Sequence, residues 1–483
     1  MNNRLRPFFT RTSPRLATLV LALVLTGCAG LQSSAYQTPA AQLPQQWEQG
    51  APTRNAANAA NATVVATPDN WWRQFNDPAL SQVVESALAR NNDLAAAALR
   101  VRQAQLQAGI AGTAGSPQLS GNVSASGSRR LEGSGNATAR SSGVSASVSY
   151  EVDLWGRVAA TRDAAEWTAR ATAEDRETTA QALAGTAAGL YWQLAYLNER
   201  VASANDSLAY ARRTQELVRA QYDAGAVSAL ELREAEQTVS SQQAALTLLE
   251  QQRVETRNAI AVLMNAPPGA ATLAQVMAQE PAQLDTSPLP VVAAGLPADL
   301  LARRPDLRAA EAQLRATLAS GDATRASYYP ALTLTGGLGT SSAALLSLLS
   351  NPVATLGAGL TLPFLRQTEM KLSNQLSQAQ YEEAVVNFRQ TLYQAFSDVE
   401  NALSARTQFA RQGELLTQQL TAAREVERLY EVRYRAGSTS LRTWLDAQQS
   451  RRTAELAVEE NRLSQLNALA TLYRVLGGGV PAA

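Results

Sequence analysis

The sequence contains no histidine, a single cysteine and few charged residues, and each of these shortages excludes a class of function. Without histidine, neither a Ser–His–Asp triad nor a histidine-containing zinc site can form. One cysteine supplies neither an internal disulfide nor a cluster of thiolate ligands. Charged residues make up 17% of the 483 positions and the formal net charge is +1, which argues against nucleic-acid binding, because that function needs a basic face. With no nucleophile–base arrangement or phosphate-binding loop either, we expect no enzymatic activity, no metal, no cofactor and no nucleic-acid partner.

The only cysteine, Cys28, follows a segment typical of a secretory signal. Several arginines precede an apolar run that is too short to span a bilayer permanently. The run ends in Leu25-Thr-Gly-Cys28, which is similar to the lipobox of bacterial lipoproteins, where the cysteine is acylated and becomes the first residue. An ordinary signal peptide with a chance cysteine is the alternative. We predict a signal peptide at 1–27, a lipid on Cys28 and an extended linker at 28–70, and Ala29 after the cysteine indicates the outer membrane.

Two halves of the chain carry the same features at a constant spacing. Tyr222-x-x-Gly225 returns about 212 residues later as Tyr434-x-x-Gly437. A constant offset over a long span indicates that one structural unit was duplicated in tandem. The predicted domains are repeat 1 at 71–264, a linker at 265–296, repeat 2 at 297–476 and a tail at 477–483.

Each half contains two short segments in which apolar and small polar residues alternate. The predicted strands lie at about 118–127, 143–153, 331–340 and 354–363. Strands of this length, apolar on one side and Ser/Thr/Gly on the other, are typical of a transmembrane β-barrel, although an edge of a soluble β-sandwich alternates in the same way. Four strands cannot close a barrel, and hydrocarbon does not tolerate open strand edges. Several chains must therefore combine: two would give eight strands, and three would give twelve strands with room for a lumen.

Very long helical patterns follow the strand pairs. One runs from about 158 to 221 and the other from about 369 to 435, and neither contains proline. Each helix would be on the order of 100 Å long. Apolar residues recur at steps of three and four, as in Leu392, Ala395 and Val399. Such narrow stripes predict coiled-coil packing against neighbours on both sides, whereas a soluble helical bundle would have much shorter helices.

Each long helix is predicted to end at a helical hairpin. Gly225 and Gly437 suit the left-handed position that stops a helix, and Ser228 and Ser440 suit the N-cap of the return helix. The two tips span 222–234 and 434–446.

One turn into the return helices, four side chains are candidates for lining the narrow end of a tube: Leu232, Glu234, Trp444 and Asp446. Carboxylates contributed by several chains would form a ring that gates or selects ions. A merely solvated helix carboxylate is the alternative for Asp446.

Several longer motifs occur in order along the chain. They are Trp71-Trp-Arg-Gln-Phe-Asn-Asp-Pro78, Tyr150-Glu-Val-Asp-Leu-Trp-Gly-Arg157, Leu301-Ala-Arg-Arg-Pro-Asp-Leu-Arg-Ala-Ala-Glu311, Tyr328-Tyr-Pro330, Arg433-Tyr-Arg-Ala-Gly437 and Leu445-Asp-Ala-Gln448. With these motifs the chain resembles the TolC-like outer-membrane efflux channels, in the lipid-anchored OprM/NodT family. The resemblance extends from about residue 28 to the end.

The resemblance implies an α+β membrane protein that forms a homotrimer. A twelve-stranded β-barrel, with four strands per chain, would lie in the lipid of the outer membrane. A long α-helical barrel would extend into the periplasm, with 265–296 in a mixed equatorial region around it. The implied function is a passive exit duct of a tripartite efflux system, with an outer-membrane component of type I protein secretion and a non-conducting periplasm-spanning scaffold as alternatives. Drugs, metals, siderophores and polypeptides are all compatible cargoes.

The resemblance also assigns roles to the tips. They would meet a periplasmic adaptor (a membrane fusion protein) that connects to an inner-membrane pump of RND type, and the gate would open there. The family's tip aspartate falls on Asp446, and Arg442 stands where relatives are often apolar. This departure suggests that Arg442 pairs with Asp446 or Glu234 to hold the tip shut. The implied adaptor-contact residues are Tyr222, Gly225, Ser228, Tyr434, Gly437 and Ser440.

Overall fold

A computed structural model describes residues 34–41, 44–49, 70–129, 138–271, 276–290, 292, 297–342 and 352–478. The predicted signal peptide, the predicted lipid site at Cys28 and most of the predicted linker at 28–70 lie outside the described residues. The chain divides into two compact units. Unit 1 comprises Gln103–Ala169, Ala312–Val386 and the described part of Met1–Pro39, and unit 2 comprises the rest.

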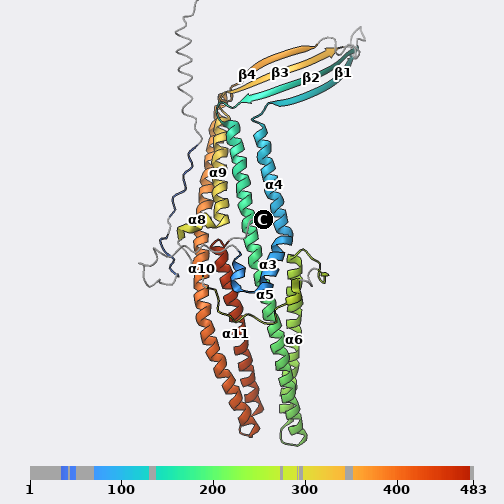
Figure 1. Ribbon diagram of the computed structural model, residues 1–483, viewed down its shortest axis with the longest axis vertical. Helices are drawn as coiled ribbons and strands as arrows, with labels where there is room; N and C mark the ends of the chain where they lie inside the picture. The colour runs from blue at the N-terminus through green and yellow to red at the C-terminus, as the bar shows by residue number, and fades with distance from the viewer. Residues whose placement is uncertain are drawn as a thin grey trace, which may run out of the picture. The chain divides into compact units, whose positions relative to one another are not determined.

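Both halves of the chain have the same order of elements: helices, two strands, a very long helix and a return helix (Figure 1). The first half contains η2 (Trp71–Phe75), α3 (Pro78–Arg90), α4 (Asn92–Thr113), β1 (Gln118–Arg129), β2 (Thr138–Val152), α5 (Arg157–Asp223) and α6 (Ala229–Leu263). The second half contains α8 (Leu300–Arg303), α9 (Pro305–Ala326), β3 (Ala331–Ser342), β4 (Val353–Thr361), α10 (Gln367–Arg435) and α11 (Leu441–Val475). Short 3₁₀ helices lie at η3 (Met277–Gln279), η4 (Pro297–Asp299) and η6 (Pro363–Leu365).

The four strands of unit 1 form one antiparallel sheet in the order β1-β2-β3-β4. Its register places apolar residues side by side on one face, where Leu119 lies opposite Val148. Hydroxyl side chains occupy the other face, where the Oγ atoms of Ser120 and Ser147 are 2.7 Å apart. The predicted alternation of an apolar side and a Ser/Thr/Gly side is confirmed.

Several strand ends differ from the predicted bounds, and β1 and β3 each extend two residues further than predicted, to Arg129 and Ser342. β2 begins at Thr138 and not at 143, because the residues before 143 pair with the end of β1 although they lack an apolar alternation. β4 ends at Thr361 and not at 363, because Pro363 has no N–H to donate to a ladder.

Both outer strands of the sheet are open. Every residue of β1 and β4 is exposed, and within the described part of the chain neither strand has a hydrogen-bonded neighbour on its outer edge. Leu356 is 95% exposed and Leu119 is 81% exposed. An apolar face and two unpaired edges are features that proteins normally cover, so the sheet is incomplete within one chain.

The turn from β2 into α5 is fixed by polar contacts within unit 1. The carboxylate of Asp153 accepts hydrogen bonds from the backbone N–H groups of Val158 and Ala159, which satisfies donors of the first turn of α5. Trp155 stacks on Tyr329, with ring centroids 5.3 Å apart, and its Nε1–H donates to the Pro330 carbonyl at 2.7 Å. Trp155 is therefore a packed corner residue.

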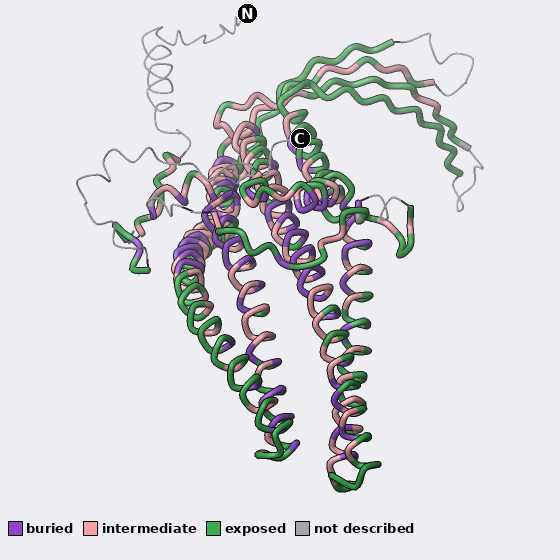
Figure 2. The backbone as a smooth tube through the Cα atoms, turned by 60° about the horizontal axis from the view of Figure 1, so that its bottom comes forward, coloured by how far each residue is buried: buried purple, intermediate pink, exposed green. Residues whose placement is uncertain are grey.

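In unit 2 the long helices pack through the stripes expected from the sequence. On α10, Leu392, Ala395 and Val399 are buried, as predicted. Toward the tip α10 is largely exposed (Figure 2). Large apolar side chains that remain exposed there are Leu415, Val426, Leu429 and Val432. Among the described residues, no helix combines the length and apolar composition needed to cross a membrane.

Candidate functional site

The candidate site comprises the two hairpin tips of unit 2, and their turns have the expected backbone. Gly225 and Gly437 have φ angles of +73° and +69°, the left-handed region that glycine enters without steric cost. The N–H of Gly225 donates to the Tyr222 carbonyl, and the N–H of Gly437 donates to the Tyr434 carbonyl, both at 2.9 Å. These bonds satisfy carbonyls at the ends of α5 and α10.

The predicted serines begin the return helices. The backbone N–H and the hydroxyl of Ser228 both donate to the Glu231 carboxylate, at 2.7 and 3.1 Å. Ser440 Oγ accepts from the backbone N–H of Thr443 at 3.3 Å. Both serines are therefore N-caps, and the reciprocal arrangement at Ser228 is a capping box.

An apolar cluster joins the α5/α6 hairpin to the α10/α11 hairpin just behind the tips. Trp444 is 2% exposed, stacks on Tyr434 with centroids 5.1 Å apart and meets Tyr210 edge-on at 6.3 Å. The buried members are Val218, Leu232, Ala235, Tyr434, Leu441, Trp444 and Leu445.

The cluster corrects two predicted positions. Trp444 and Leu232 were expected to face a lumen, but both are buried within a single chain. Side chains covered by their own chain cannot line a channel, so they act by holding the two hairpins together.

The two tyrosines of the repeated motif have different surroundings. Tyr222 is 41% exposed. Tyr434 is 7% exposed, and its hydroxyl donates to Gln221 Oε1 at 2.8 Å. Burial raises the pKa of Tyr434. The expectation that Tyr434 contacts an adaptor is corrected, because this side chain belongs to the cluster.

The charged residues of the tips lie on the exposed side of this cluster. Arg442 Nη1 is 3.7 Å from Glu234 Oε1, and Arg442 Nε is 3.4 Å from Asp446 Oδ1. Arg442 thus makes both of the ion pairs considered from the sequence, one across the hairpins and one within α11. The side chains of Arg442 and Asp446 are 70% and 67% exposed, so each pair contributes only about 0.2–1 kcal/mol.

A partly buried polar layer, which the sequence did not predict, lies next to the apolar cluster. Arg451 on α11 pairs with Glu427 on α10 and with Glu455 on its own helix. Tyr210 on α5 faces the same group, and burial, reinforced by the Glu427 carboxylate, raises its pKa to about 12. Charged residues at steps of four along α11 were the available signal, but helical periodicity alone does not say which face is buried.

The same face of α11 contains polar atoms without partners. Gln448 is fully buried, and neither atom of its amide makes a hydrogen bond within the described part of the chain. The same holds for Arg452 Nη1 and Trp444 Nε1. A buried orphan group costs about 1–3 kcal/mol. These unpaired polar atoms oppose the packing of the two hairpins, and the apolar cluster must offset their cost.

A second contact between α5 and α11 involves a carboxyl that titrates near neutral pH. Ser203 Oγ donates to Glu459 Oε1 at 3.4 Å. Burial raises the pKa of Glu459 to about 7, with Glu199 acting in the same direction and Arg200 in the opposite one. Among the described residues, no group of carboxylates is arranged to hold a metal ion.

Comparison with known proteins identifies the family. The family model described as outer membrane efflux protein matches residues 83–266 and 296–478. The pyoverdine export outer membrane protein OpmQ of Pseudomonas putida is 36% identical over 479 residues, covering 97% of this chain and 98% of that protein. The probable efflux pump outer membrane protein TtgC of Pseudomonas putida is 32% identical, covering 97% and 96%.

Solved structures agree with these relatives. The open state of the MtrE outer membrane channel of Neisseria gonorrhoeae is 28% identical, with a TM-score of 0.75, and the match covers 93% of this chain and 98% of that chain. The CmeC outer membrane channel of Campylobacter jejuni is 24% identical, with a TM-score of 0.83 and coverage of 93% and 95%, which supports the fold. The predicted resemblance and the predicted efflux function are confirmed. Because the family model matches more than half of the chain and the relatives are covered almost completely, the chain belongs to the outer membrane efflux proteins.

Proposed function

We propose that the protein is the passive exit duct of a tripartite efflux system and works as a homotrimer. One observation carries this proposal: each chain contributes a four-stranded sheet with an apolar face, a hydroxyl face and two open edges. Unpaired edges are not tolerated in hydrocarbon, so the sheets of neighbouring chains must pair. Three copies give twelve strands and enough circumference for a water-filled lumen lined by the Ser/Thr/Gly face.

The helices support the same assembly. Apolar side chains such as Leu415 and Val432 stay exposed along α10, which suits a helical barrel in which neighbouring chains cover them. Such a barrel would extend into the periplasm and place the hairpin tips at its far end. The two separate matches to the family model fit a tandem duplication, in which each half supplies two strands and one long hairpin.

Partners and cargo follow from the relatives. Proteins named for pyoverdine export and for efflux pumps suggest small organic molecules as cargo. Because no energy-coupling site was found in the sequence, an inner-membrane pump, which we assign to the RND type, would drive transport through a periplasmic adaptor. The adaptor would contact the exposed tip residues Tyr222, Gly225, Ser228, Gly437 and Ser440.

The tip is the proposed gate, and bilayer recordings test both the gate and the duct. Arg442→Glu should raise single-channel conductance several-fold, because it removes two attractions and places a third carboxylate beside Glu234 and Asp446. Arg442→Ala combined with Asp446→Ala should give a smaller increase. High salt should reproduce part of the effect in the wild-type protein by screening.

A matched control distinguishes an effect on the gate from a general effect of removing an exposed ion pair. Arg428 and Glu425 form a similarly exposed pair on α10, with side chains 60% and 56% exposed. The double variant Arg428→Ala, Glu425→Ala should conduct like the wild-type protein. If the Arg442 variants also conduct like wild type, the gate lies elsewhere. If neither the wild-type protein nor any variant conducts, the non-conducting scaffold is the better description.

Lipid anchoring is proposed at Cys28, and its removal has a specific expected result. Cys28→Ser should abolish incorporation of labelled palmitate, because the sequence contains no second cysteine. The variant should still assemble in the outer membrane, since the sheet and not the lipid supplies most of the apolar surface. Palmitate label that persists on the variant would contradict the assignment of the lipobox.

A further inference from the structure

An apolar groove of about 520 Å³ runs across three strands of the sheet in unit 1. Its lining follows the register of the sheet, where Tyr150 lies opposite Leu334 and Val148 lies opposite Gly336. On β4 the lining continues with Leu356 and Ala358. These positions belong to the apolar face, which in the proposed barrel meets lipid. The groove therefore suits a hydrocarbon occupant, and its volume lies within the range of small-molecule pockets.

The centre of the groove lacks a side chain because β3 has a glycine there. Gly336 stands between Leu334 and Leu338 on the same face of the strand. A Cβ atom at this position would lie 3.1 Å from Val148 Cγ1 and 3.6 Å from Leu356 Cδ2. One added carbon would thus contact both walls, so a larger side chain at position 336 would fill the groove.

The groove lies at the end of the sheet where the helices join it. Tyr150 is two residues from the end of β2, and Gly336 is five residues from the start of β3. At about 3.3 Å per residue the groove reaches about 16 Å along the strands, roughly half of the 30 Å hydrocarbon core. A tyrosine near the strand end suits the membrane–water interface. The groove therefore matches one acyl chain that enters from the periplasmic side.

The N-terminal segment is fixed to α9, which leads into β3. The backbone N–H and the hydroxyl of Ser34 donate to the Asp322 carboxylate at 2.8 and 2.7 Å, and Arg325 Nη2 donates to Ser34 Oγ at 2.6 Å. Nearby, the Arg315 guanidinium lies over the ring of Tyr36, 4.1 Å from its centroid. We call these five residues the N-terminal clamp. All of them belong to unit 1, as the sheet does.

The clamp limits where a lipid on Cys28 can lie. Cys28 precedes Ser34 by six residues, which span at most about 20 Å when fully extended. Asp322 is four residues, or about 6 Å, from the end of α9, and β3 begins soon after at Ala331. An acyl chain on Cys28 would thus start near the end of the sheet that contains the groove. Tethering gives this chain a high effective concentration there, which a free phospholipid lacks.

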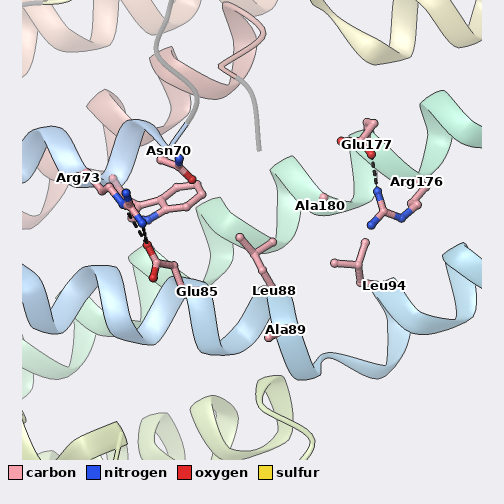
Figure 3. A pocket seen from close by; sticks show the side chains of 10 residues that line it. Asn70, Arg73, Glu85, Leu88, Ala89, Leu94, Arg176, Glu177 and Ala180 are labelled. Atoms are coloured by element: carbon pink, nitrogen blue, oxygen red, sulfur yellow. Dashed lines mark hydrogen bonds and ion pairs between the residues drawn. The ribbon is translucent and has the colours of Figure 1, made fainter. Parts of the chain in front are cut away.

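A second cavity, in unit 2, is poorly suited to a hydrocarbon chain. It lies between η2, α3, α4 and α5, and its lining includes the ion pairs Arg73–Glu85 and Arg176–Glu177 (Figure 3). A hydrocarbon chain placed there would take charged groups out of water without replacing their hydration. By contrast, the described lining of the groove on the sheet contains no charged side chain.

We propose that the groove binds the acyl chain carried by Cys28, so that the lipid anchor packs against the sheet of its own chain. This docking rests on the proposed lipid anchor and on the proposed lipid-facing side of the sheet. It adds a defined site to both, in which the N-terminal clamp positions the lipid and Gly336 leaves room for it. Free phospholipid is the competing occupant.

Photo-crosslinking in cells distinguishes the two occupants. Cells are grown with a palmitate analogue that carries a diazirine and an alkyne, which enters both phospholipid and Cys28. After irradiation, mass spectrometry of the digested protein separates residues joined to the Cys28 peptide from residues joined to phospholipid. Links from Cys28 should fall on Val148, Leu334 and Leu356 at least fivefold more often than on Val123. The latter lies on the same face of β1, is 78% exposed and is outside the lining.

Two leucine substitutions on the apolar face provide a matched pair. Gly336→Leu should fill the groove and reduce the links from Cys28 at least fivefold. Ala354→Leu, at an exposed position on the same face but outside the lining, should leave them unchanged. Asp322→Ala, which releases the clamp without altering the sheet, should lower them about threefold. Light scattering shows whether each variant keeps the oligomeric state of the wild-type protein.

Failure of the lipid anchor and failure of the docking give different results. A labelled Cys28 that links only to phospholipid, or evenly over the apolar face, would overturn the docking alone. Links that persist unchanged in both Gly336→Leu and Asp322→Ala would do the same. If Cys28 carries no label, the lipid anchor is wrong and the docking is wrong with it.

Discussion

Trp444→Ala is expected to free the two hairpin tips from each other and to lower the free energy of local opening by about 3–5 kcal/mol. The indole is 2% exposed and packs between Tyr434 and Tyr210, so its removal leaves a cavity where the two hairpins meet. The neighbouring polar atoms of Gln448 and Arg452 that lack hydrogen-bond partners would then be hydrated, which further stabilises the open state. Hydrogen exchange of the tip amides should accelerate at least 100-fold.

Two further variants serve as controls for Trp444→Ala. Trp444→Phe keeps an aromatic ring in the cluster and removes an N–H that has no partner, so its exchange should stay within about tenfold of wild type. Leu230→Ala alters a tip side chain that is 67% exposed and should change little. If Trp444→Ala exchanges as slowly as wild type, the apolar cluster does not hold the tips together.

The tip shows why local features were predictable and the packing was not. The left-handed glycines and the N-cap serines depend on a few neighbouring residues, so the motif around Gly225 and Gly437 was enough. Burial depends on which face of a return helix meets the other hairpin. A stripe that recurs every three or four residues fits packing on either side, and this is why Trp444 and Leu232 were wrongly placed toward a lumen.

The two tips also differ in a way that their shared motif does not reveal. Leu232 and Trp444 occupy equivalent positions, but only the larger Trp444 offers a ring on which the motif tyrosine can stack. Tyr434 is therefore buried, and Tyr222 is exposed. The polar layer around Glu427 and Arg451 was not predicted either. It forms only when the long helices are packed together, and the sequence pattern does not show which helix faces meet.

The strands were predictable because apolar and small polar side chains alternate along them with a period of two. This alternation is the same in a single strand and in a paired sheet. Each strand shows which of its side chains share a face, and the register confirms that apolar rows stand beside apolar rows. The number of chains does not follow from this pattern. It depends on pairing between open edges, which lies beyond a single chain.

Leu356→Arg is expected to prevent assembly in the outer membrane. Leu356 lies on the apolar face of β4 and is 95% exposed, so in the proposed barrel it faces lipid. An arginine on the lipid face near the bilayer midplane costs about 2–4 kcal/mol per chain, and a trimer would bear this cost three times. Light scattering of the detergent extract should find little trimer, and outer-membrane fractions should contain little of the variant.

The neighbouring residue provides the control that identifies the two faces. Thr355 precedes Leu356 on the same strand and lies on the opposite, hydroxyl face, where its Oγ1 donates to the Gly337 carbonyl at 3.4 Å. Thr355→Arg should therefore assemble as a trimer, because its guanidinium group would lie in water within the lumen, and it should shift the ion selectivity toward anions. The opposite result, with Leu356→Arg assembled and Thr355→Arg lost, would mean that the sheet turns its hydroxyl face outward. If both variants assemble and conduct like wild type, these strands do not form the wall of the duct.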